Sequence, residues 1–152
     1  MFPKIPRQVL LLLLLYAKNN EEVVGRSKLQ KMLFLIQKEE FKREPLSGVV
    51  ERYNFHPHFF GPFSDEVTDD IEFLRSLGLI EVKTLRGVEV FYLTEKGLKK
   101  MCDLIEEGKI PYFMLDATER VKKKWNRKPT EELTKYVYKH YPEYTTRSRI
   151  RI

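Results

Sequence analysis

Residues 64–94, which read SDEVTDDIEFLRSLG followed by LIEVKTLRGVEVFYLT, decide the fold. Ser64 with acidic residues directly behind it is typical of a helix start, because anions stabilise the positive end of the helix dipole. Gly78 predicts the end of that helix, since glycine readily takes the left-handed conformation of a C-cap. Segments 79–85 and 88–93 then have the composition of two strands. We expect a loop slightly longer than two residues at Arg86-Gly87, because arginine fits poorly where φ must be positive.

Two helices are predicted ahead of this unit. Pro6 suits the first turn of a helix, and the apolar run at 9–15 predicts that this helix is buried on most sides. The segment SKLQ at 27–30 has the form of a capping box, which predicts the start of a second helix. Apolar residues then recur three and four positions apart, so we expect this helix to continue to about Arg43, where Pro45 prevents its extension.

The other segments complete a mainly helical pattern. Residues 51–60 alternate polar and aromatic side chains and are predicted to be extended, with a turn at Gly61-Pro62. A fourth helix is expected at 94–107, capped by its first residue. Two more helices are expected at 116–125 and 130–141.

The predicted order is helix, helix, helix, two-stranded hairpin, helix. We therefore expect a mainly α protein with a small β-hairpin. Residues 1–110 are predicted to form a winged helix-turn-helix-like core in which the hairpin is the wing. Residues 111–152 are predicted to form a basic C-terminal helical extension.

The charge is unevenly distributed along the chain. The net charge is +6 and the pI is about 9.3, and residues 111–152 hold 11 Lys and Arg against 5 Asp and Glu, which is the whole excess. Such a segment favours an acidic partner, nucleic acid first, although a basic helix can also be merely solvated. Cys102 is the single cysteine, which excludes an intrachain disulfide and favours a cytoplasmic protein. The apolar run at 9–15 is too short for a bilayer, which needs about 20 residues, so no membrane partner is expected.

Three short motifs carry a resemblance to known proteins. The segment KLQKMLF at 28–34 resembles the KLQKLL[YF] opening of the SocA-like Panacea family. Residues 53–64, in which Gly61-Pro62 follows aromatic residues, resemble that family's aromatic-x-x-G-P motif. The segment YLTEKG at 92–97 resembles the Y-x-L-T-x-x-G that follows the wing in many archaeal winged-helix regulators. Members of the Panacea family are described as phage-associated proteins or antitoxins, so the resemblance implies a winged-helix-like regulator or antitoxin without catalysis.

Our first functional hypothesis is a non-catalytic, DNA-binding regulator of transcription. The C-terminal basic cluster and the wing would contact the phosphates of duplex DNA, and a lysine stripe on the second helix either tracks phosphates or is simply solvated. Trp125 either stacks on a base or anchors its own helix to the core. The candidate DNA-binding residues are Lys122, Lys123, Lys124, Trp125, Arg127, Lys128, Lys83, Arg86, Lys28, Lys31, Lys38 and Lys42.

The acidic third helix supports a different hypothesis. The helix ahead of a wing normally enters the major groove, but this one would be repelled by duplex DNA, which carries one negative charge per about 1.7 Å. The alternative function is a protein-binding antitoxin or adaptor that attracts a basic partner with its acids and anchors it with aromatic side chains, unless those aromatics are simply core. The candidate residues are Asp65, Glu66, Asp69, Asp70, Glu72, Phe59 and Phe60.

Catalytic and metal-binding signals are weak. His56 and His58 lie two apart in an extended segment and so share a face, but the spacing supplies no clear third or fourth ligand. We predict no metal, no cofactor and a core position for Cys102. The sequence contains no Ser-His-Asp order, phosphate loop or glycine-rich fingerprint, so no catalytic residue is predicted.

The last predicted helix has an apolar stripe formed by Leu133, Tyr136, Val137 and His140. Such a stripe needs a surface to cover, which is either residues 9–15 of the same chain or the same segment of a second chain. Because dimeric winged-helix proteins commonly pair through added terminal helices, we expect a homodimer.

Overall fold

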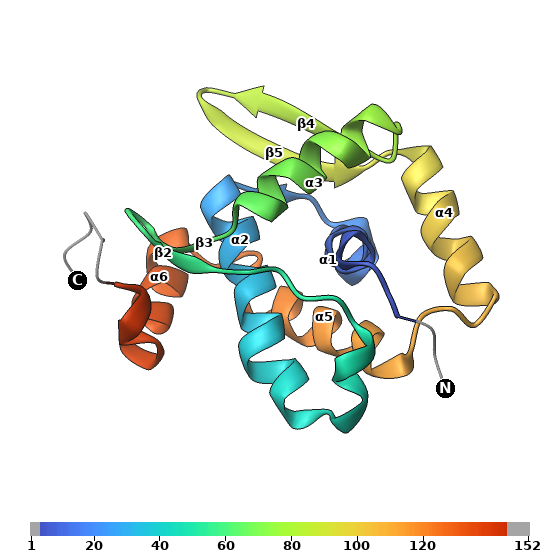
Figure 1. Ribbon diagram of the computed structural model, residues 1–152. Coiled ribbons are helices and arrows are strands. Elements are labelled where there is room, and N and C mark those ends of the chain that lie inside the picture. The colour runs from blue at the N-terminus through green and yellow to red at the C-terminus, as the bar shows by residue number, and fades with distance from the viewer. Residues whose placement is uncertain (1–3, 146–152) are drawn as a thin grey trace.

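The leucine-rich first helix lies at the centre of the fold (Figure 1). The computed structural model describes residues 4–145, and in it all of residues 10–15 of α1 (Arg7–Asn20) are buried. Six consecutive residues cover every side of a helix, so α1 must be enclosed all round. The elements α4 (Glu95–Glu106), α5 (Tyr112–Trp125) and β5 (Val88–Leu93) pack on it. The prediction of a first helix buried on most sides is confirmed.

A three-stranded antiparallel sheet includes the predicted wing. β4 (Ile80–Leu85) and β5 form its hairpin, and β1 (Val23–Val24), which the sequence did not reveal, pairs with the other side of β5. With α2 (Arg26–Leu35) and α3 (Asp65–Ser76) ahead of the hairpin, the predicted order of three helices, a two-stranded hairpin and a helix is present. The chain is mainly α with a small β-hairpin, as predicted.

The connection from α2 to α3 is much longer than the roughly three or four residues of a helix-turn-helix. It takes residues 36–64, and residues 58 and 60–63 of it line a pocket together with α2. The connection contains a π-helical turn η1 (Ile36–Glu40), the 3-10 turns η2 (Phe41–Arg43) and η3 (Pro45–Val49), and a hairpin of β2 (His56–His58) with β3 (Gly61–Phe63).

The start of α2 differs from the predicted capping box. Gly25 is the N-cap, and no side chain caps the helix. Ser27 instead accepts a hydrogen bond from Lys31, and the Gln30 side chain is bonded to Ser64. The prediction was wrong because both polar side chains bind buried groups of their own chain rather than the first turn of the helix.

Both predicted turns are placed differently in the structure. The turn at Arg86-Gly87 has two residues, with φ of 52° and 79°, so arginine does take the left-handed conformation there. Gly61-Pro62 belongs to β3, and the reversal of the chain falls two residues earlier, at residues 59–60.

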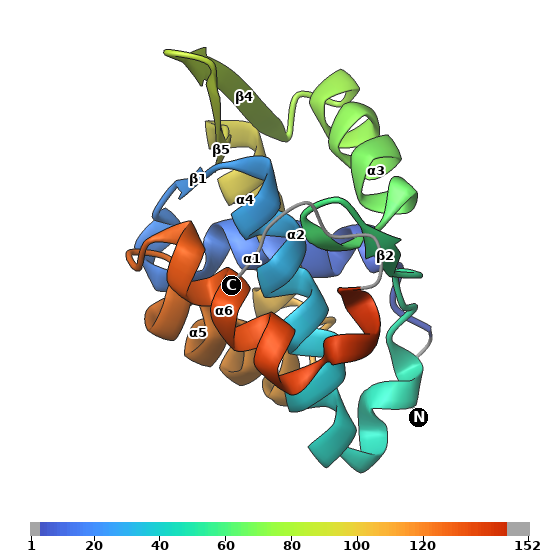
Figure 2. The same cartoon turned by 90° about the vertical axis from the view of Figure 1, so that its left-hand side faces the viewer.

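The C-terminal helices complete the same hydrophobic core. The helix α5 packs on α1, and α6 (Thr130–His140) packs on α2 (Figures 1 and 2). Leu133 and Val137 of the apolar stripe are fully buried, Tyr136 is partly buried and His140 is exposed. The stripe therefore covers α2 of its own chain and gives no reason for a dimer, so the homodimer stays a prediction.

Within residues 4–145, no helix combines the length and the apolar composition that crossing a membrane requires. Cys102 is a free cysteine on α4 and is only partly buried.

Candidate functional site

The two segments that resemble the Panacea motifs lie against each other. Gln30 accepts a hydrogen bond from the Ser64 amide (3.0 Å) and donates its own side-chain amide to the Ser64 carbonyl oxygen (3.1 Å). Both residues are buried, so these bonds satisfy backbone groups that water cannot reach. The start of α3 is thereby fixed to the middle of α2.

Gly61 allows β3 to approach α2 closely. Its φ is +103°, and a Cβ at this position would lie 3.0 Å from Cε1 of Tyr138 and 3.5 Å from Cε of Lys31. Any other residue would be strained by the backbone conformation and crowded by the tyrosine ring. The hairpin, α2 and α6 therefore meet around Lys31.

A pocket of about 360 Å³ opens where α2 meets the β2–β3 hairpin. The ring of His58 stacks on Phe63 at 4.8 Å, and Phe60 is 54% exposed. Mostly apolar walls with a few placed polar groups are the usual composition of a binding pocket. The residues that matter most for its chemistry are Arg26, Ser27, Lys31, Phe60, Pro62 and Phe63.

Lys31 is the buried charge of this pocket. It is 1% exposed, and its ammonium donates to Oγ of Ser27 at 2.5 Å, its one hydrogen bond to the described residues. Burial lowers the pKa of Lys31 to about 8, so the side chain is still mostly protonated at neutral pH. Because an ammonium has three N–H donors, Lys31 has donors left for an acceptor that enters the pocket.

An acidic surface continues from the pocket along α3. Asp65, Asp69 and Glu72 are exposed, and Arg75 is paired with Glu72 at 3.1 Å. The exposed face of this helix thus keeps an excess of negative charge. This exposed negative charge is the basis for expecting that α3 does not enter a DNA groove.

Two of the five candidate acids bind inside the protein instead. Nε of Arg7 lies 2.8 Å from Asp70, and Nη1 of Arg7 lies 2.9 Å from Glu66. Asp70 is 3% exposed, and a buried carboxylate needs such a partner. Asp70 is therefore unavailable to a basic partner, which corrects the prediction for this residue.

Three of the predicted DNA-binding lysines are buried, which corrects their assignment as phosphate contacts. Besides Lys31 these are Lys28, at 6% exposed, and Lys122, at 0%. Lys28 donates to the carbonyl oxygens of Asn126 and Lys128 at the end of α5. The physical reason is that the last carbonyl groups of a helix lack internal donors, and lysine ammonium groups can supply them.

Trp125 is also buried, at 6% exposed, and anchors α5 rather than presenting a ring to a base. Nearby, Arg127 is paired with Glu21 at 2.7 Å. The ammonium groups of Lys124 and Lys128 lie 5.3 and 4.8 Å from the Trp125 ring centroid. The exposed members of the predicted cluster are Lys123, Lys124, Arg127 and Lys128.

The other predicted basic residues lie elsewhere on the surface. Lys83 and Arg86 are exposed on the wing, which in both views lies on the opposite side of α1 from α5 (Figures 1 and 2). Lys38 and Lys42 lie on the connection after α2. The structure therefore does not gather the predicted cations into one surface.

The histidines form no metal centre with the residues that the structure describes. His56 lies 3.4 Å from Asp65, and no cluster of three or more His, Cys, Asp or Glu capable of holding a metal occurs within residues 4–145. His58 instead packs against Phe63 in the pocket.

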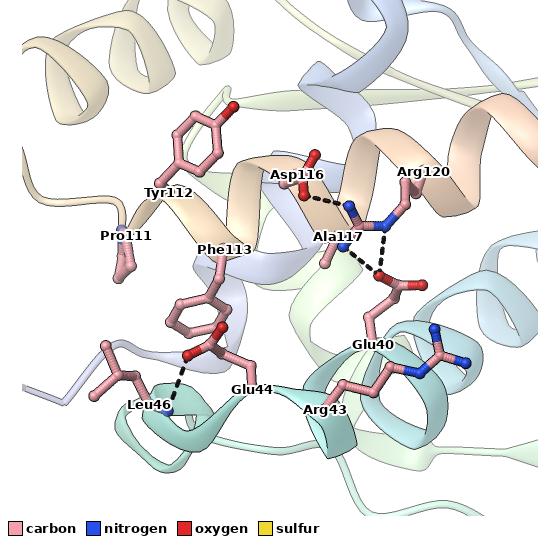
Figure 3. Close-up of a pocket in the computed structure, with 10 residues that line it drawn as sticks. All are labelled: Glu40, Arg43, Glu44, Leu46, Pro111, Tyr112, Phe113, Asp116, Ala117 and Arg120. Carbon is pink, nitrogen blue, oxygen red and sulfur yellow. Dashed lines mark hydrogen bonds and ion pairs between the residues drawn. The ribbon is translucent and has the colours of Figure 1, made fainter.

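A second hollow, of about 430 Å³, lies between the turns after α2 and the start of α5 (Figure 3). Arg120 points between Glu40 and Asp116 and is paired with both. The carboxylate of Glu44 accepts a hydrogen bond from the Leu46 amide at 3.2 Å. The guanidinium of Arg120 is already bound by two carboxylates of the protein, so this hollow is a weaker candidate than the pocket at Lys31.

Sequence reasoning did not identify most of the residues that line the pocket between α2 and the β2–β3 hairpin. Ser27 and Gln30 were interpreted as a capping box, Pro62 as part of a turn, and Lys31 as surface charge. The available signal was the position of Lys31 in a helix whose neighbouring residues 29–36 are otherwise almost entirely apolar.

The fold and the pocket thus define a mainly α protein with a small β-hairpin and an apolar site that contains one buried lysine. No family model matches the chain. Over 80 residues, which cover 50% of this chain and 43% of the relative, it is 42% identical to the uncharacterized protein YwgA of Bacillus subtilis (strain 168). The similarity thus spans less than half of the length of YwgA, and the Panacea resemblance stays a prediction.

Proposed function

We propose that this chain is a non-catalytic, protein-binding module of the antitoxin or adaptor type, that it acts in the cytoplasm, and that it holds its partner in the pocket between α2 and the β2–β3 hairpin. The observation that carries the proposal is the exposed ring of Phe60 at a pocket that also contains the buried ammonium of Lys31. An exposed aromatic side chain beside an apolar pocket is the usual anchor of a protein interface.

The surroundings of the pocket support a partner with defined chemistry. An apolar side chain of the partner fits the walls formed by Pro62 and Phe63, and a main-chain carbonyl of the partner would accept a hydrogen bond from Lys31. The acids of α3, Asp69 and Glu72, would attract Lys or Arg on either side of that anchor. The occupant we propose is therefore an apolar residue in a basic protein segment.

Affinity purification with matched variants tests this proposal. Phe60→Ala removes the anchor, and Asp69→Lys combined with Glu72→Lys reverses the charge of the acidic face. Leu85→Ala is the control, because Leu85 is 60% exposed on the wing, away from the pocket. We expect one protein that the wild type and Leu85→Ala retain and that both pocket-side variants lose.

The affinity of the purified partner for each variant then gives the size of the effect. Removing a central aromatic anchor is expected to weaken the affinity about tenfold or more. Capture that is equal for wild type, Phe60→Ala and the charge-reversed variant would overturn the proposal.

A second candidate function is binding of duplex DNA by the exposed lysines at the end of α5. It is favoured by Lys124 and Lys128, which are exposed and form no ion pair with the described residues. If these lysines contact phosphates, replacing both with Gln should reduce the salt dependence of binding by about 0.9 in log–log slope per lost contact. Fluorescence anisotropy of labelled duplex DNA at low salt measures this, and no binding at micromolar protein would exclude it.

A further inference from the structure

Three cations surround a separate hollow of about 390 Å³ beside the turns that follow α2. Lys38 and Lys42 come from η1 and η2, Arg52 comes from the extended segment before β2, and Tyr144 of η4 (Pro142–Tyr144) closes one side. In Figure 2 the turn η4 lies beside β2, in agreement with their contacts. The hollow thus joins three segments that are distant in the sequence.

The side chain of Gln37 fixes the position of these segments. It donates to the Tyr53 carbonyl oxygen at 3.0 Å and accepts from the Tyr53 amide at 2.8 Å. Arg52, the neighbour of Tyr53, is therefore held close to Lys38 and Lys42. The π-helical geometry of η1, which places Gln37 here, is rare in proteins and is frequent at functional sites.

The cations of this hollow have no carboxylate partner within residues 4–145. Arg52 lies over the Phe41 ring at 4.8 Å and donates to Oγ of Ser47 at 2.9 Å, both uncharged groups. Lys38 lies over the Tyr144 ring at 5.5 Å. Burial lowers the pKa of Arg52, as is expected of a cation without a counter-charge.

The nearby acids bind other groups. Glu39, beside Lys38 in the sequence, accepts hydrogen bonds from the hydroxyls of Tyr136 and Tyr141 at 2.7 and 3.0 Å. Glu66 accepts the Asn54 amide at the edge of the hollow but is itself ion-paired with Arg7. None of the residues that line the hollow is acidic.

We propose that this hollow binds the phosphate group of a small phosphorylated molecule. Arginine and lysine together are suited to phosphate, because the guanidinium donates two parallel hydrogen bonds and the ammonium groups add charge. The hollow has the size of a small-molecule site, whereas duplex DNA is usually tracked by cations spread along a surface. The inference does not depend on the protein-binding proposal, which concerns a different pocket.

Calorimetric titration of the intact chain tests the inference. The probes are inorganic phosphate, pyrophosphate and ATP, each at constant ionic strength set with chloride. Lys42→Gln and Arg52→Gln each remove one of the proposed contacts, and each is expected to weaken binding by roughly tenfold. Lys135→Gln is the matched control, because this exposed lysine of α6 is paired with Glu131 and lies outside the hollow, so binding should be unchanged.

The thermal midpoints of the unliganded variants show whether they fold. Arg52→Lys keeps the positive charge but lacks the two parallel N–H donors of the guanidinium. It provides a second variant if Arg52→Gln is unstable. Binding of phosphate probes that is lost in the Lys42 and Arg52 variants and kept in Lys135→Gln supports the site. The inference is overturned if no probe binds at millimolar concentration, if Lys135→Gln weakens binding equally, or if a short DNA duplex binds the hollow more tightly than every small probe.

Discussion

The ammonium of Lys122 lies 2.7 Å from the carbonyl oxygen of Ala17 and 3.0 Å from that of Leu15, in the interior of the protein. At Ala17 the backbone of α1 leaves helical geometry, so its carbonyl groups have no helical partners there. A lysine of α5 thus completes the end of α1. This contact, together with the bonds of Lys28 to the end of α5, explains how the C-terminal helices are attached.

The position of Lys122 predicts an unusual dependence of stability on pH. Burial lowers the pKa of Lys122 from 10.5 to about 7. Between these values the unfolded chain binds a proton that the folded chain lacks, so folding becomes more favourable as pH rises from about 7 towards 10.5. The slope from one such proton is at most about 1.4 kcal/mol per pH unit.

Chemical denaturation of wild type and Lys122→Met at several pH values measures this effect. The free energy of unfolding of the wild type, minus that of the variant, should increase between pH 7 and pH 10. Lys123→Met is the control, since Lys123 is exposed, and its difference from the wild type should not change. Parallel curves for wild type and Lys122→Met would show that Lys122 keeps its proton.

The hydrogen bonds of Gln30 predict a loss of stability when its amide is removed. Gln30→Leu leaves the buried amide and carbonyl of Ser64 without partners, which should lower the free energy of unfolding by about 2–3 kcal/mol. Hydrogen exchange locates the effect. The Ser64 amide should exchange faster in Gln30→Leu, and the Tyr53 amide should exchange faster in Gln37→Leu. If either variant increased exchange equally at both amides, the assignment of each glutamine to its own backbone partner would be contradicted.

The ion pair of Arg7 with Asp70 predicts a second large effect on stability. Arg7→Met removes both hydrogen bonds that the guanidinium donates to the buried Asp70 carboxylate, which should lower the free energy of unfolding by about 3 kcal/mol. Arg75→Met breaks an exposed pair and should change it by less than about 1 kcal/mol. Equal changes in the two variants, measured by urea denaturation, would mean that burial of Asp70 does not matter.

Much of the fold was predictable because local chemistry fixes helix ends. Thr94 caps α4 by accepting the Gly97 amide at 3.0 Å, and Gly78 has a φ of 74°, as the sequence suggested. The predicted wing strands, 79–85 and 88–93, differ from β4 and β5 by a single residue at the start of β4. The two-residue strand β1 was missed because Val23-Val24 is too short to show any periodicity.

The candidate site was predicted less well, because charge was taken as a sign of exposure. Lys122 lies three and four positions from Trp125 and Thr118, both buried, so helical spacing already placed it on the inner face of α5. Composition alone cannot reveal that a buried ammonium satisfies carbonyl groups of another helix. Phe60 and the exposed acids of α3 were named from the sequence, whereas the pocket beside them depends on tertiary contacts of Gly61.

Site-directed photocrosslinking tests the protein-binding proposal most directly. A photoreactive phenylalanine analogue replaces Phe60 in one variant and Leu85 in another, and each is irradiated in native lysate. We predict that position 60 gives a defined covalent adduct with one protein, which the Asp69→Lys/Glu72→Lys background abolishes, and that position 85 does not give this adduct. No protein adduct from position 60, or the same adducts from both positions, would contradict the proposal that this pocket holds the partner.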